Sequence, residues 1–239
     1  MSWLLVIGGN SDIGFSTAKI FASYGYNVHL ASRDIDQLNL KKKIIEKTYS
    51  VICKISLLDL YDTESIEEFL KNNKINPKII LVAAGYMENP EILFKKIIKI
   101  NYSNLVEIIE KLIIKDFNQK KLSTIIGISS IAGERGKKDN CIYSSAKAAF
   151  TLYLDGLRQR LYRKNIDVLT IKPGYVDTKM TKNLNLSHYL ISSPDKIGKI
   201  IFESYQKNRN IVYAPYFWKI ILFVYKNIPE FVFKLKLTK

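Results

Sequence analysis

The sequence is poor in cysteine and lacks the features of an exported protein. Two cysteines occur among 239 residues, and Cys53 and Cys141 lie far apart, in no spacing typical of a metal site or a disulfide framework. No charged leader precedes the first apolar segment, so we expect no signal peptide. These features predict a reducing, cytoplasmic setting and no bound metal.

Acidic residues are in deficit: 22 aspartates and glutamates face 37 lysines and arginines, which gives a formal net charge of +15. A basic excess attracts polyanions such as nucleic acid, anionic lipid or phosphorylated substrates. The lysines are spread through a chain rich in lysine, asparagine and isoleucine, however, and no basic block with interleaved aromatic residues is present. We therefore expect no nucleic-acid partner.

The chain also lacks a linker, an internal repeat and a break in composition, so we expect one main domain with a sizeable core. Short apolar runs alternate with helical patterns along its length. This alternation predicts an α/β fold, in which a doubly wound parallel sheet of about seven strands carries helices on both faces. The expected strands are 3–7, 27–31, 50–55, 78–83, 122–128, 167–171 and 211–213, and the main expected helices are 37–47, 65–70, 90–115, 141–163 and one starting at Pro194.

A glycine-rich turn follows the first expected strand. Gly8, Gly9 and Gly14 lie between the apolar run and a helical pattern that includes Ile13. Glycines let the backbone approach a pyrophosphate, and the N-terminus of the following helix attracts its negative charge. A strand, a glycine turn and a helix in this order favour dinucleotide binding over a simple tight turn.

The end of the second expected strand bears on the choice of dinucleotide. In dinucleotide-binding folds an acidic residue at this point favours NAD, whereas a nearby arginine accommodates the 2′-phosphate of NADP. Here the neutral Ala31 and Ser32 close the strand and Arg33 follows. This favours NADP(H) over NAD(H), although Arg33 is also compatible with an ordinary surface charge. The acidic Asp34 would instead favour NAD(H), but an aspartate at this position is also a natural helix N-cap.

Tyr143 and Lys147 are four residues apart, so they share one face of the expected helix. The positive charge of a lysine beside a phenol favours the phenolate and lowers the tyrosine pKa from about 10. Such a tyrosine can exchange a proton with an alcohol or ketone oxygen. The hydroxyl of Ser130 could hold that same oxygen by a hydrogen bond. The tyrosine–lysine spacing also occurs on solvated helix surfaces, so its weight depends on its surroundings.

Several candidate residues follow expected strands, at the carboxyl edge where parallel α/β sheets bind their ligands. They are Gly8, Arg33, Gly85, Ser130 and Pro173. Ser130 precedes Ile131-Ala132-Gly133, and the pair Tyr143 and Lys147 begins 13 residues after it. With the glycine turn of residues 7–14, this order resembles the short-chain dehydrogenase/reductase family over about residues 3–213. The resemblance implies a Rossmann-type fold in its compact, single-domain form.

The resemblance also implies a role for each matched residue. The catalytic set would be Tyr143, Lys147, Ser130 and Asn101, and the asparagine would hold a proton-relay water. Asp59 would contact the adenine, and Thr178 would meet the nicotinamide carboxamide. The implied cofactor-binding residues are Gly8, Asn10, Ser11, Ile13, Gly14, Arg33, Asp59, Ala84, Gly85, Tyr143, Lys147, Pro173, Gly174, Val176 and Thr178.

The sequence departs from the family pattern at three positions. Ile7 stands in place of the leading threonine of the glycine turn, and Asp12 stands in place of its middle glycine. An aspartate there could cap the helix, but a carboxylate is unfavourable beside a pyrophosphate. Ala83 replaces the asparagine after the fourth strand, which removes one structural hydrogen bond. No basic residue lies in the turn, which weakens the preference for NADP(H).

Residues 214–239 form an aromatic and basic extension beyond the catalytic domain, which we place at residues 1–213. The apolar run 220–225 is too short to span a bilayer, and Pro229 divides the extension into two short amphipathic segments. Such segments either lie in a membrane interface or pack on protein. This extension and Asp12 are also similar to reductases of polyprenyl-phosphate-linked 2-keto-pentofuranose, a weaker resemblance than that of the catalytic residues.

These features predict an NADP(H)-dependent enzyme that interconverts a ketone and a secondary alcohol, with a lipid-linked sugar as one substrate class. The alternatives are a 3-oxoacyl reductase, a general alcohol dehydrogenase and a non-catalytic NADPH-binding scaffold or regulatory protein. Substrate choice should depend on residues 86–97, 134–142 and 179–193. The resemblance also implies a homodimer or homotetramer. We expect a cytoplasmic location, at the inner face of the membrane if the extension binds lipid.

Overall fold

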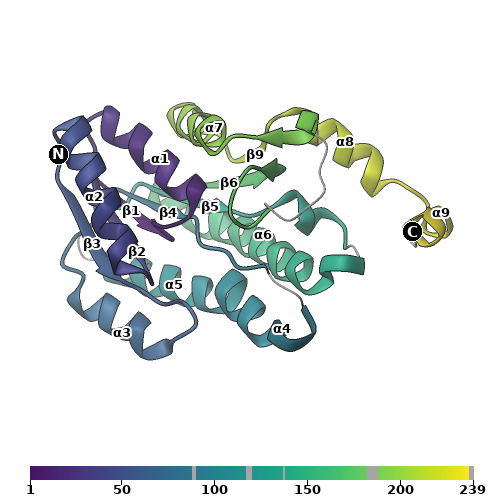
Figure 1. Ribbon diagram of the computed structural model, residues 1–239, viewed down its shortest axis with the longest axis horizontal. Coiled ribbons are helices and arrows are strands. Elements are labelled where there is room, and N and C mark those ends of the chain that lie inside the picture. The colour runs from purple at the N-terminus through teal and green to yellow at the C-terminus, as the bar shows by residue number, and fades with distance from the viewer. Residues whose placement is uncertain (88–89, 117–119, 137, 182–187, 237–239) are drawn as a thin grey trace.

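The computed structural model describes residues 1–87, 90–116, 120–136, 138–181 and 188–236. A parallel sheet of seven strands forms the centre of the molecule, in the order β3-β2-β1-β4-β5-β6-β9 (Figure 1). Its strands are β1 (Trp3–Ile7), β2 (Asn27–Ser32), β3 (Cys53–Leu57), β4 (Ile79–Val82), β5 (Thr124–Ile128), β6 (Asp167–Pro173) and β9 (Ile211–Ala214). Two short strands, β7 (Tyr175–Val176) and β8 (Ile191–Ser192), form a separate parallel pair. The predicted seven-stranded, doubly wound α/β fold is confirmed.

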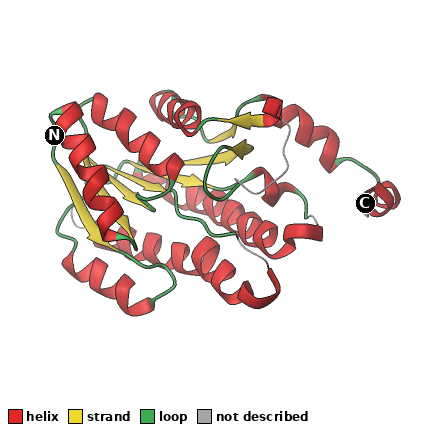
Figure 2. Cartoon of the chain, viewed as in Figure 1, coloured by secondary structure: helices red, strands yellow, loops and turns green. Residues whose placement is uncertain are grey.

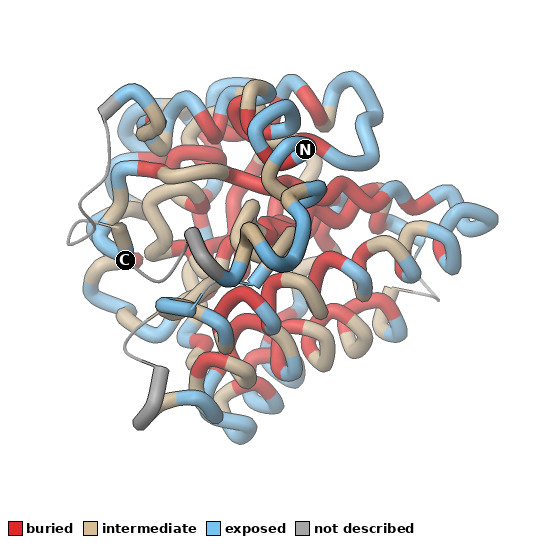
Figure 3. The backbone as a smooth tube through the Cα atoms, turned by 90° about the vertical axis from the view of Figure 1, so that its right-hand side faces the viewer, coloured by how far each residue is buried: buried red, intermediate tan, exposed pale blue. Residues whose placement is uncertain are grey.

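Helices cover both faces of the sheet (Figure 2). They are α1 (Asp12–Ser23), α2 (Ile35–Tyr49), α3 (Thr63–Asn72), α4 (Pro90–Ile98), α5 (Asn104–Asp116), α6 (Cys141–Leu161), α7 (Pro194–Gln206), α8 (Phe217–Lys226) and α9 (Glu230–Lys236). Successive residues of a strand point to opposite faces. In β1, Leu4 and Val6 join a core with α1, α2 and α7, whereas Leu5 and Ile7 join a second core with α3, α5 and α6. Figure 3 shows these buried layers between exposed outer turns.

Side-chain caps fix where several helices begin. Ser11, Asp34, Asp62 and Ser193 each accept a hydrogen bond from a backbone N–H of the first turn that follows. These N–H groups have no acceptor within the helix, so a side-chain oxygen at the cap stabilises the helix by roughly 1 kcal/mol. The predicted cap at Asp34 is confirmed. The caps at Ser11 and Asp34 also fix the chain on either side of the glycine turn.

Two predicted boundaries were wrong. The third strand begins at Cys53 instead of Ser50, because α2 continues to Tyr49 and Ser50 ends it with a left-handed φ of 50°. The single helix expected over 90–115 is divided into α4 and α5 by a π-helical turn, Lys99–Ser103. A π-helical turn carries an extra residue per turn and is frequent at functional sites. Here it contains Asn101.

The C-terminal helices α8 and α9 lie at one edge of the molecule, beyond β9 (Figure 1). As predicted, Pro229 separates two short helices. Trp218 and Leu222 of α8 are each only 5% exposed, so one face of this helix belongs to the core. Within the described residues, no helix is long and apolar enough to cross a membrane. A boundary between domain and extension at residue 213 stays a prediction.

Candidate active site

The glycine turn after β1 brings three chain segments together. The N–H groups of Gly8 and Gly9 donate to the carbonyl oxygen of Ala31, at 2.9 and 3.0 Å. Gly8 has a φ of 92°, and a Cβ atom built on it would lie 2.5 Å from the backbone nitrogen of Ala84. A Cβ on Gly14 would lie 2.8 Å from the carbonyl oxygen of Gly8. Both positions therefore require glycine, since any side chain would separate the turn from its neighbours.

The residues of the turn fit a dinucleotide. The Ser11 hydroxyl accepts from Gly14 N at 3.3 Å, which leaves the N–H groups of Asp12 and Ile13 without an acceptor inside the helix. The Asn10 amide donates to the carbonyl oxygen of Asp34 at 2.8 Å, while its buried Oδ1 has no partner among the described residues. A helix N-terminus and a close backbone approach are what a pyrophosphate needs. The turn can therefore hold one.

Asp12 has a partner that the sequence did not indicate. Its Oδ2 accepts a hydrogen bond from the backbone N–H of Lys179, at 3.2 Å, and so ties α1 to the segment after β7. The ammonium of Lys41 lies close by and donates to the carbonyl oxygen of Gly9 at 3.2 Å. Burial lowers the pKa of Lys41 to about 8, and the charge of Asp12 acts against this shift. Lys41 therefore brings a positive charge to a turn that has no basic residue of its own.

Two other predicted cofactor residues lie at the ends of β2 and β3. Arg33 is exposed and makes no ion pair with any residue in the described ranges. Asp59 follows β3, where its Oδ1 accepts from Tyr61 N at 2.9 Å and its own N–H donates to the Ser65 hydroxyl at 2.9 Å. These bonds account for the fold of the turn at Asp59. Arg33 directly follows β2 and is exposed there.

Burial dominates the electrostatics of Tyr143 and Lys147, both of which lie on α6. Tyr143 is 9% exposed, and burial raises its pKa to about 12, although a hydrogen bond with Ser130 opposes the rise. The Lys147 ammonium lies 5.9 Å from the centroid of the Tyr143 ring and donates to the carbonyl oxygen of Ile128 at 3.1 Å. Burial lowers the pKa of Lys147 to about 8. The predicted lowering of the tyrosine pKa by Lys147 is therefore wrong for this arrangement, because desolvation is the larger effect.

The loop after β5 is anchored to α6 through Ser129, which the sequence analysis missed. The Ser129 hydroxyl donates to the carbonyl oxygen of Lys147 at 3.0 Å and lies 2.6 Å from the Thr151 hydroxyl. The Ser130 hydroxyl accepts from Ala132 N at 3.0 Å and begins a short 3₁₀ turn. These bonds place Ser130 beside Tyr143. Hydroxyl residues near a candidate serine are common in any sequence, so no local signal distinguished Ser129.

Asn101 is fully buried, and its side chain bonds to the backbone of two residues. Its amide donates to the carbonyl oxygens of Tyr86 and Ile97, at 2.6 and 2.9 Å, and its Oδ1 accepts from Tyr86 N at 3.1 Å. A Cβ atom built on Gly85 would lie 3.4 Å from Asn101 Oδ1 and 3.7 Å from Lys147 Nζ. Gly85, Asn101 and Lys147 therefore meet in one place. The same Cβ position is 3.6 Å from the terminal methyl of Met180, a neighbour that no sequence pattern predicted.

The segment after β6 contains the last group of predicted residues. The N–H of Gly174 donates to the carbonyl oxygen of Ala214 at 3.0 Å, and this glycine lies directly against the Trp218 ring. Thr178 lies 3.2 Å from the Thr181 hydroxyl, which also donates to the carbonyl oxygen of Val176. Pro173 ends β6 and pairs with Ala214. Of the predicted substrate loops, residues 88–89, 137 and 182–187 lie outside the described residues.

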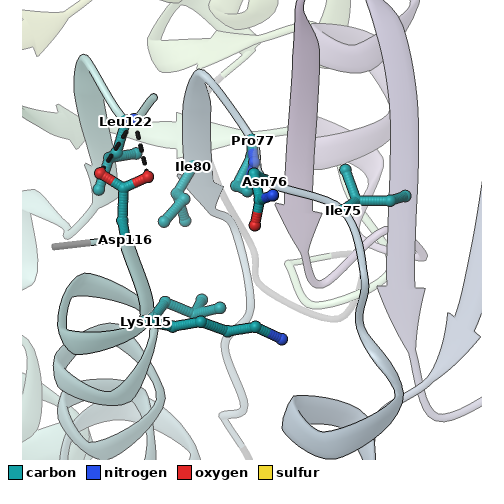
Figure 4. Close-up of a pocket in the computed structure, with 8 residues that line it drawn as sticks. Ile75, Asn76, Pro77, Ile80, Lys115, Asp116 and Leu122 are labelled. Carbon is teal, nitrogen blue, oxygen red and sulfur yellow. Dashed lines mark hydrogen bonds between the residues drawn. The ribbon is translucent and has the colours of Figure 1, made fainter. Parts of the chain in front are cut away.

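One cavity lies at the carboxyl edge of the sheet, and a second lies at the amino edge. A groove of about 470 Å³ lies beside the glycine turn, between α1, α2, α7 and the segment after β7. Its lining includes Asp12, Phe15, Lys41, Thr178 and Lys179. A much smaller pocket of about 10 Å³ lies before β4 and β5, at the amino edge of the sheet (Figure 4). No cluster of metal-ligating side chains occurs in the described part of the chain.

The smaller pocket has a structural role. Figure 4 shows the Asp116 carboxylate, whose two oxygens accept from the backbone N–H of Leu122 at 3.1 Å each. The neighbouring Lys115 donates to the carbonyl oxygens of Leu70 and Asn73. These bonds fasten the end of α5 to the chain on either side of it.

Comparison with known proteins agrees with this geometry. The short chain dehydrogenase family model matches residues 2–188. A 3-oxoacyl-[acyl-carrier-protein] reductase of Buchnera aphidicola is 30% identical over 196 residues, which cover 77% of this chain and 78% of that protein. A very-long-chain 3-oxoacyl-CoA reductase of Rattus norvegicus is 28% identical, over 75% of this chain and 61% of that protein.

Solved structures show the same fold at lower identity. A short-chain dehydrogenase from Sphingobium yanoikuyae in complex with NADPH is 18% identical and has a TM-score of 0.81, covering 96% of this chain and 97% of that one. An alcohol dehydrogenase from Comamonas testosteroni, specific for bulky-bulky ketones, is 16% identical with a TM-score of 0.80, covering 96% of each chain. The chain belongs to the short-chain dehydrogenase family and is an oxidoreductase that acts on CH–OH and C=O groups with a nicotinamide cofactor.

Proposed function

We propose that this protein is an NADP(H)-dependent reductase of a ketone, in which Tyr143, Lys147, Ser130 and Asn101 form the catalytic set. The observation that carries the proposal is the meeting of these residues at the carboxyl edge of the sheet. Ser130 is hydrogen-bonded to Tyr143, and the space next to Gly85 adjoins both Asn101 and Lys147. A ketone oxygen placed between the Ser130 and Tyr143 hydroxyls would receive two hydrogen bonds.

The ionisation of the site suits reduction. The nicotinamide, when bound, supplies the hydride that reaches the carbonyl carbon. Tyr143 gives its phenolic proton to the carbonyl oxygen, and the pKa of about 12 keeps this proton in place at neutral pH until it is needed. Lys147, with a pKa of about 8, is mostly an ammonium at neutral pH, and its charge stabilises the phenolate that remains. Ser130 orients the carbonyl, and Asn101 supports the relay water that returns a proton.

The preference for NADP(H) rests on Arg33. Its guanidinium is exposed and unpaired within the described residues, at the position where a 2′-phosphate would lie. Lys41 adds positive charge at the same turn. Among proteins with this fold, the actinorhodin polyketide ketoreductase was solved with NADPH, whereas a 3-oxoacyl-[acyl-carrier protein] reductase from Brucella melitensis was solved with NAD. The remaining predicted cofactor residues, from Gly8 to Thr178, would hold the parts that the two dinucleotides share.

A 3-oxoacyl thioester is one candidate substrate class, because relatives from Buchnera aphidicola and Rattus norvegicus are named as 3-oxoacyl reductases. A lipid-linked keto sugar is the other, supported by the exposed apolar residues of the extension 214–239. The proposal includes a cytoplasmic location, a homodimer or homotetramer, and peripheral membrane contact through the extension. A non-catalytic NADPH-binding scaffold is the alternative from another class.

The test is oxidation of NADPH and NADH by the purified protein with 3-oxoacyl thioesters, soluble ketones and a membrane-lipid extract. We expect Tyr143→Phe to lower kcat by about 10²- to 10⁴-fold, because the phenolic proton is lost, while cofactor binding stays unchanged. Binding is measured by the fluorescence of the reduced nicotinamide. Turnover retained by the variant would overturn the catalytic assignment. Binding of NADPH by the wild-type protein without turnover of any ketone would support the scaffold alternative.

A further inference from the structure

The C-terminal helices expose a continuous group of large apolar and aromatic side chains. Exposed apolar residues elsewhere on the surface are mostly scattered, which is normal for a globular protein. Between residues 216 and 231, in contrast, six large side chains are at least 40% exposed. They are Tyr216, Ile220, Ile221, Phe223, Val224 and Phe231, and we call them the outer face of the extension. A contiguous apolar patch of this kind marks an interaction surface.

The opposite face of α8 fixes the orientation of the extension. Trp218 and Leu222 are buried, and a Cβ atom built on Gly174 would lie 1.8 Å from the Trp218 ring nitrogen. The Trp218 ring also meets that of Tyr175 edge-on, with 5.5 Å between the centroids. Gly174 and Tyr175 belong to the segment after β6 that contains predicted cofactor residues. The buried face of α8 therefore packs on the segment that contains predicted cofactor residues, and the outer face lies on the other side of the same helix.

Arg135 joins α8 to α9. Its guanidinium donates to the carbonyl oxygens of Tyr225 and Ile228, at 2.8 and 2.9 Å, and pairs with Glu230 at 3.3 Å. It also lies 3.7 Å from the centroid of the Phe233 ring. A charged donor thus binds carbonyl oxygens at and just after the end of α8. One side chain holds both helices in a single arrangement.

Glu134 adds a second attachment next to the first. Its side chain is 5% exposed and pairs with Lys172 of β6 and with Lys226 of α8, the latter at 2.7 Å. The Tyr213 hydroxyl donates to the same carboxylate at 3.2 Å. Glu134 ends the short turn that starts after Ser130. The extension is therefore connected to the loop after β5 as well as to the segment after β6.

The charge around the outer face indicates what covers it. Residues 214–239 contain five lysines and one glutamate, in a chain whose net charge is +15. An apolar helix face in a lysine-rich segment is typical of a helix that lies in an anionic membrane interface. Neither α8, with ten residues, nor α9, with seven, is long enough to cross a bilayer. Contact in the plane of the interface is the arrangement that such lengths allow.

We propose that the outer face of α8 and α9 docks the protein on an anionic membrane surface, with the loop after Ser130 next to the lipid. The arrangement brings a membrane-embedded ketone to the candidate site without removing it fully from the bilayer. The assignment of a membrane-embedded ketone as the substrate rests on the proposed function. The docking itself depends only on the extension.

The test is co-sedimentation of the full chain with vesicles of phosphatidylcholine containing phosphatidylglycerol, and with vesicles of phosphatidylcholine alone. We expect binding to the anionic vesicles, and a loss of at least about tenfold in affinity in the double variant Phe223→Glu and Val224→Glu. Both side chains are exposed, so this variant should keep its folding transition. The matched control is the double variant Leu40→Glu and Ile44→Glu, which adds the same two carboxylates at exposed apolar positions of α2 and should bind as wild type.

Two outcomes would overturn the docking proposal. Equal vesicle binding by the double variant and the wild type would show that the outer face does not contact lipid. Absence of vesicle binding, together with a dimer in light scattering that the double variant loses, would show that a second copy of the chain covers the face. Turnover is measured separately with NADPH and each of the 3-oxoacyl thioesters, soluble ketones and lipid extract named above. Vesicle binding without turnover would refute the proposed function and leave the docking intact.

Discussion

At the scale of single residues, burial decides the protonation of the two central side chains. Lys147 is 2% exposed, and its ammonium donates a hydrogen bond to the carbonyl oxygen of Ile128. Tyr143 is also buried. Burial raises its pKa to about 12 and lowers that of Lys147 to about 8. The neutral phenol of Tyr143 can donate a proton, and the positive charge of Lys147 stabilises the phenolate that this leaves. The same desolvation that prepares the site makes the fold less stable.

Because burial of the Lys147 ammonium destabilises the fold, we expect Lys147→Met to make the protein more stable. The variant should also be inactive. A lysine pKa that falls from 10.5 to about 8 corresponds to roughly 3 kcal/mol at pH 7. The lost hydrogen bond to Ile128 offsets about 1 kcal/mol of this gain. We therefore expect the free energy of unfolding to rise by about 2 kcal/mol at pH 7, as measured by urea denaturation.

The pH dependence of the same variant has a definite sign. Between pH 8 and 10.5 an unfolded Lys147 still holds its proton, whereas the folded one has released it, so wild-type stability rises with pH in this window. Lys147→Met should lack that rise, and the difference between the two proteins should shrink as pH increases. Lys71→Met, at an exposed position of α3, is the control and should change little. A difference that does not vary with pH would contradict the assigned burial effect.

The sequence predicted which residues meet at the site better than it predicted their ionisation. Tyr143, Ser130 and Lys147 stand at fixed intervals in the chain, so a strand followed by a helix brings them to one edge. The direction of a pKa shift depends on how much of the surrounding protein excludes water, and no local pattern records this. Asp12 shows the same limit, because its partner, the N–H of Lys179, is distant in sequence.

At the scale of secondary-structure elements, the π-helical turn between α4 and α5 depends on Asn101. Three hydrogen bonds join its side chain to the backbone of Tyr86 and Ile97. Asn101→Ala removes all three at a side chain that is fully buried. We expect the free energy of unfolding to fall by about 2–4 kcal/mol, since buried backbone groups lose their partners. Chemical denaturation measures this change.

Asn39→Ala is the matched control, because Asn39 is exposed on α2 and should tolerate the change within about 0.5 kcal/mol. A purely catalytic Asn101 would instead lower turnover and leave the unfolding transition unchanged. Asn101→Ala with wild-type stability would therefore refute the structural role.

The elements themselves were largely predictable, and the exceptions have physical causes. Strands buried on both faces appear as continuous apolar runs, such as Ile79–Val82, and these were found. The break at residues 99–103 was not found, because the apolar pattern continues through it and only the tertiary bonds of Asn101 favour the extra residue. The start of β3 was misplaced because the left-handed Ser50 gives no signal in the sequence.

At the scale of the whole molecule, the C-terminal extension is part of the folded structure. Its two short helices were predictable from Pro229, but the contacts that hold them were not. Gly174 was expected to serve a cofactor, and in the structure it also makes room for Trp218. Arg135 lies in a loop without any motif, and its partners are about 90 residues away. Such contacts arise only when β5, β6 and β9 are assembled side by side.

This integration predicts that a chain ending at Pro215 is markedly less stable than the full protein. The truncation removes Trp218 and Leu222 from the core, and loss of a buried tryptophan side chain alone costs about 3–5 kcal/mol. For a chain of this size we expect Tm to fall by at least about 6 °C. A chain ending at Ile228, which retains α8, is the control and should lose much less. If the chain ending at Pro215 melts like the full protein, the extension is an independent appendage, and its outer face has no fixed position on the rest of the fold.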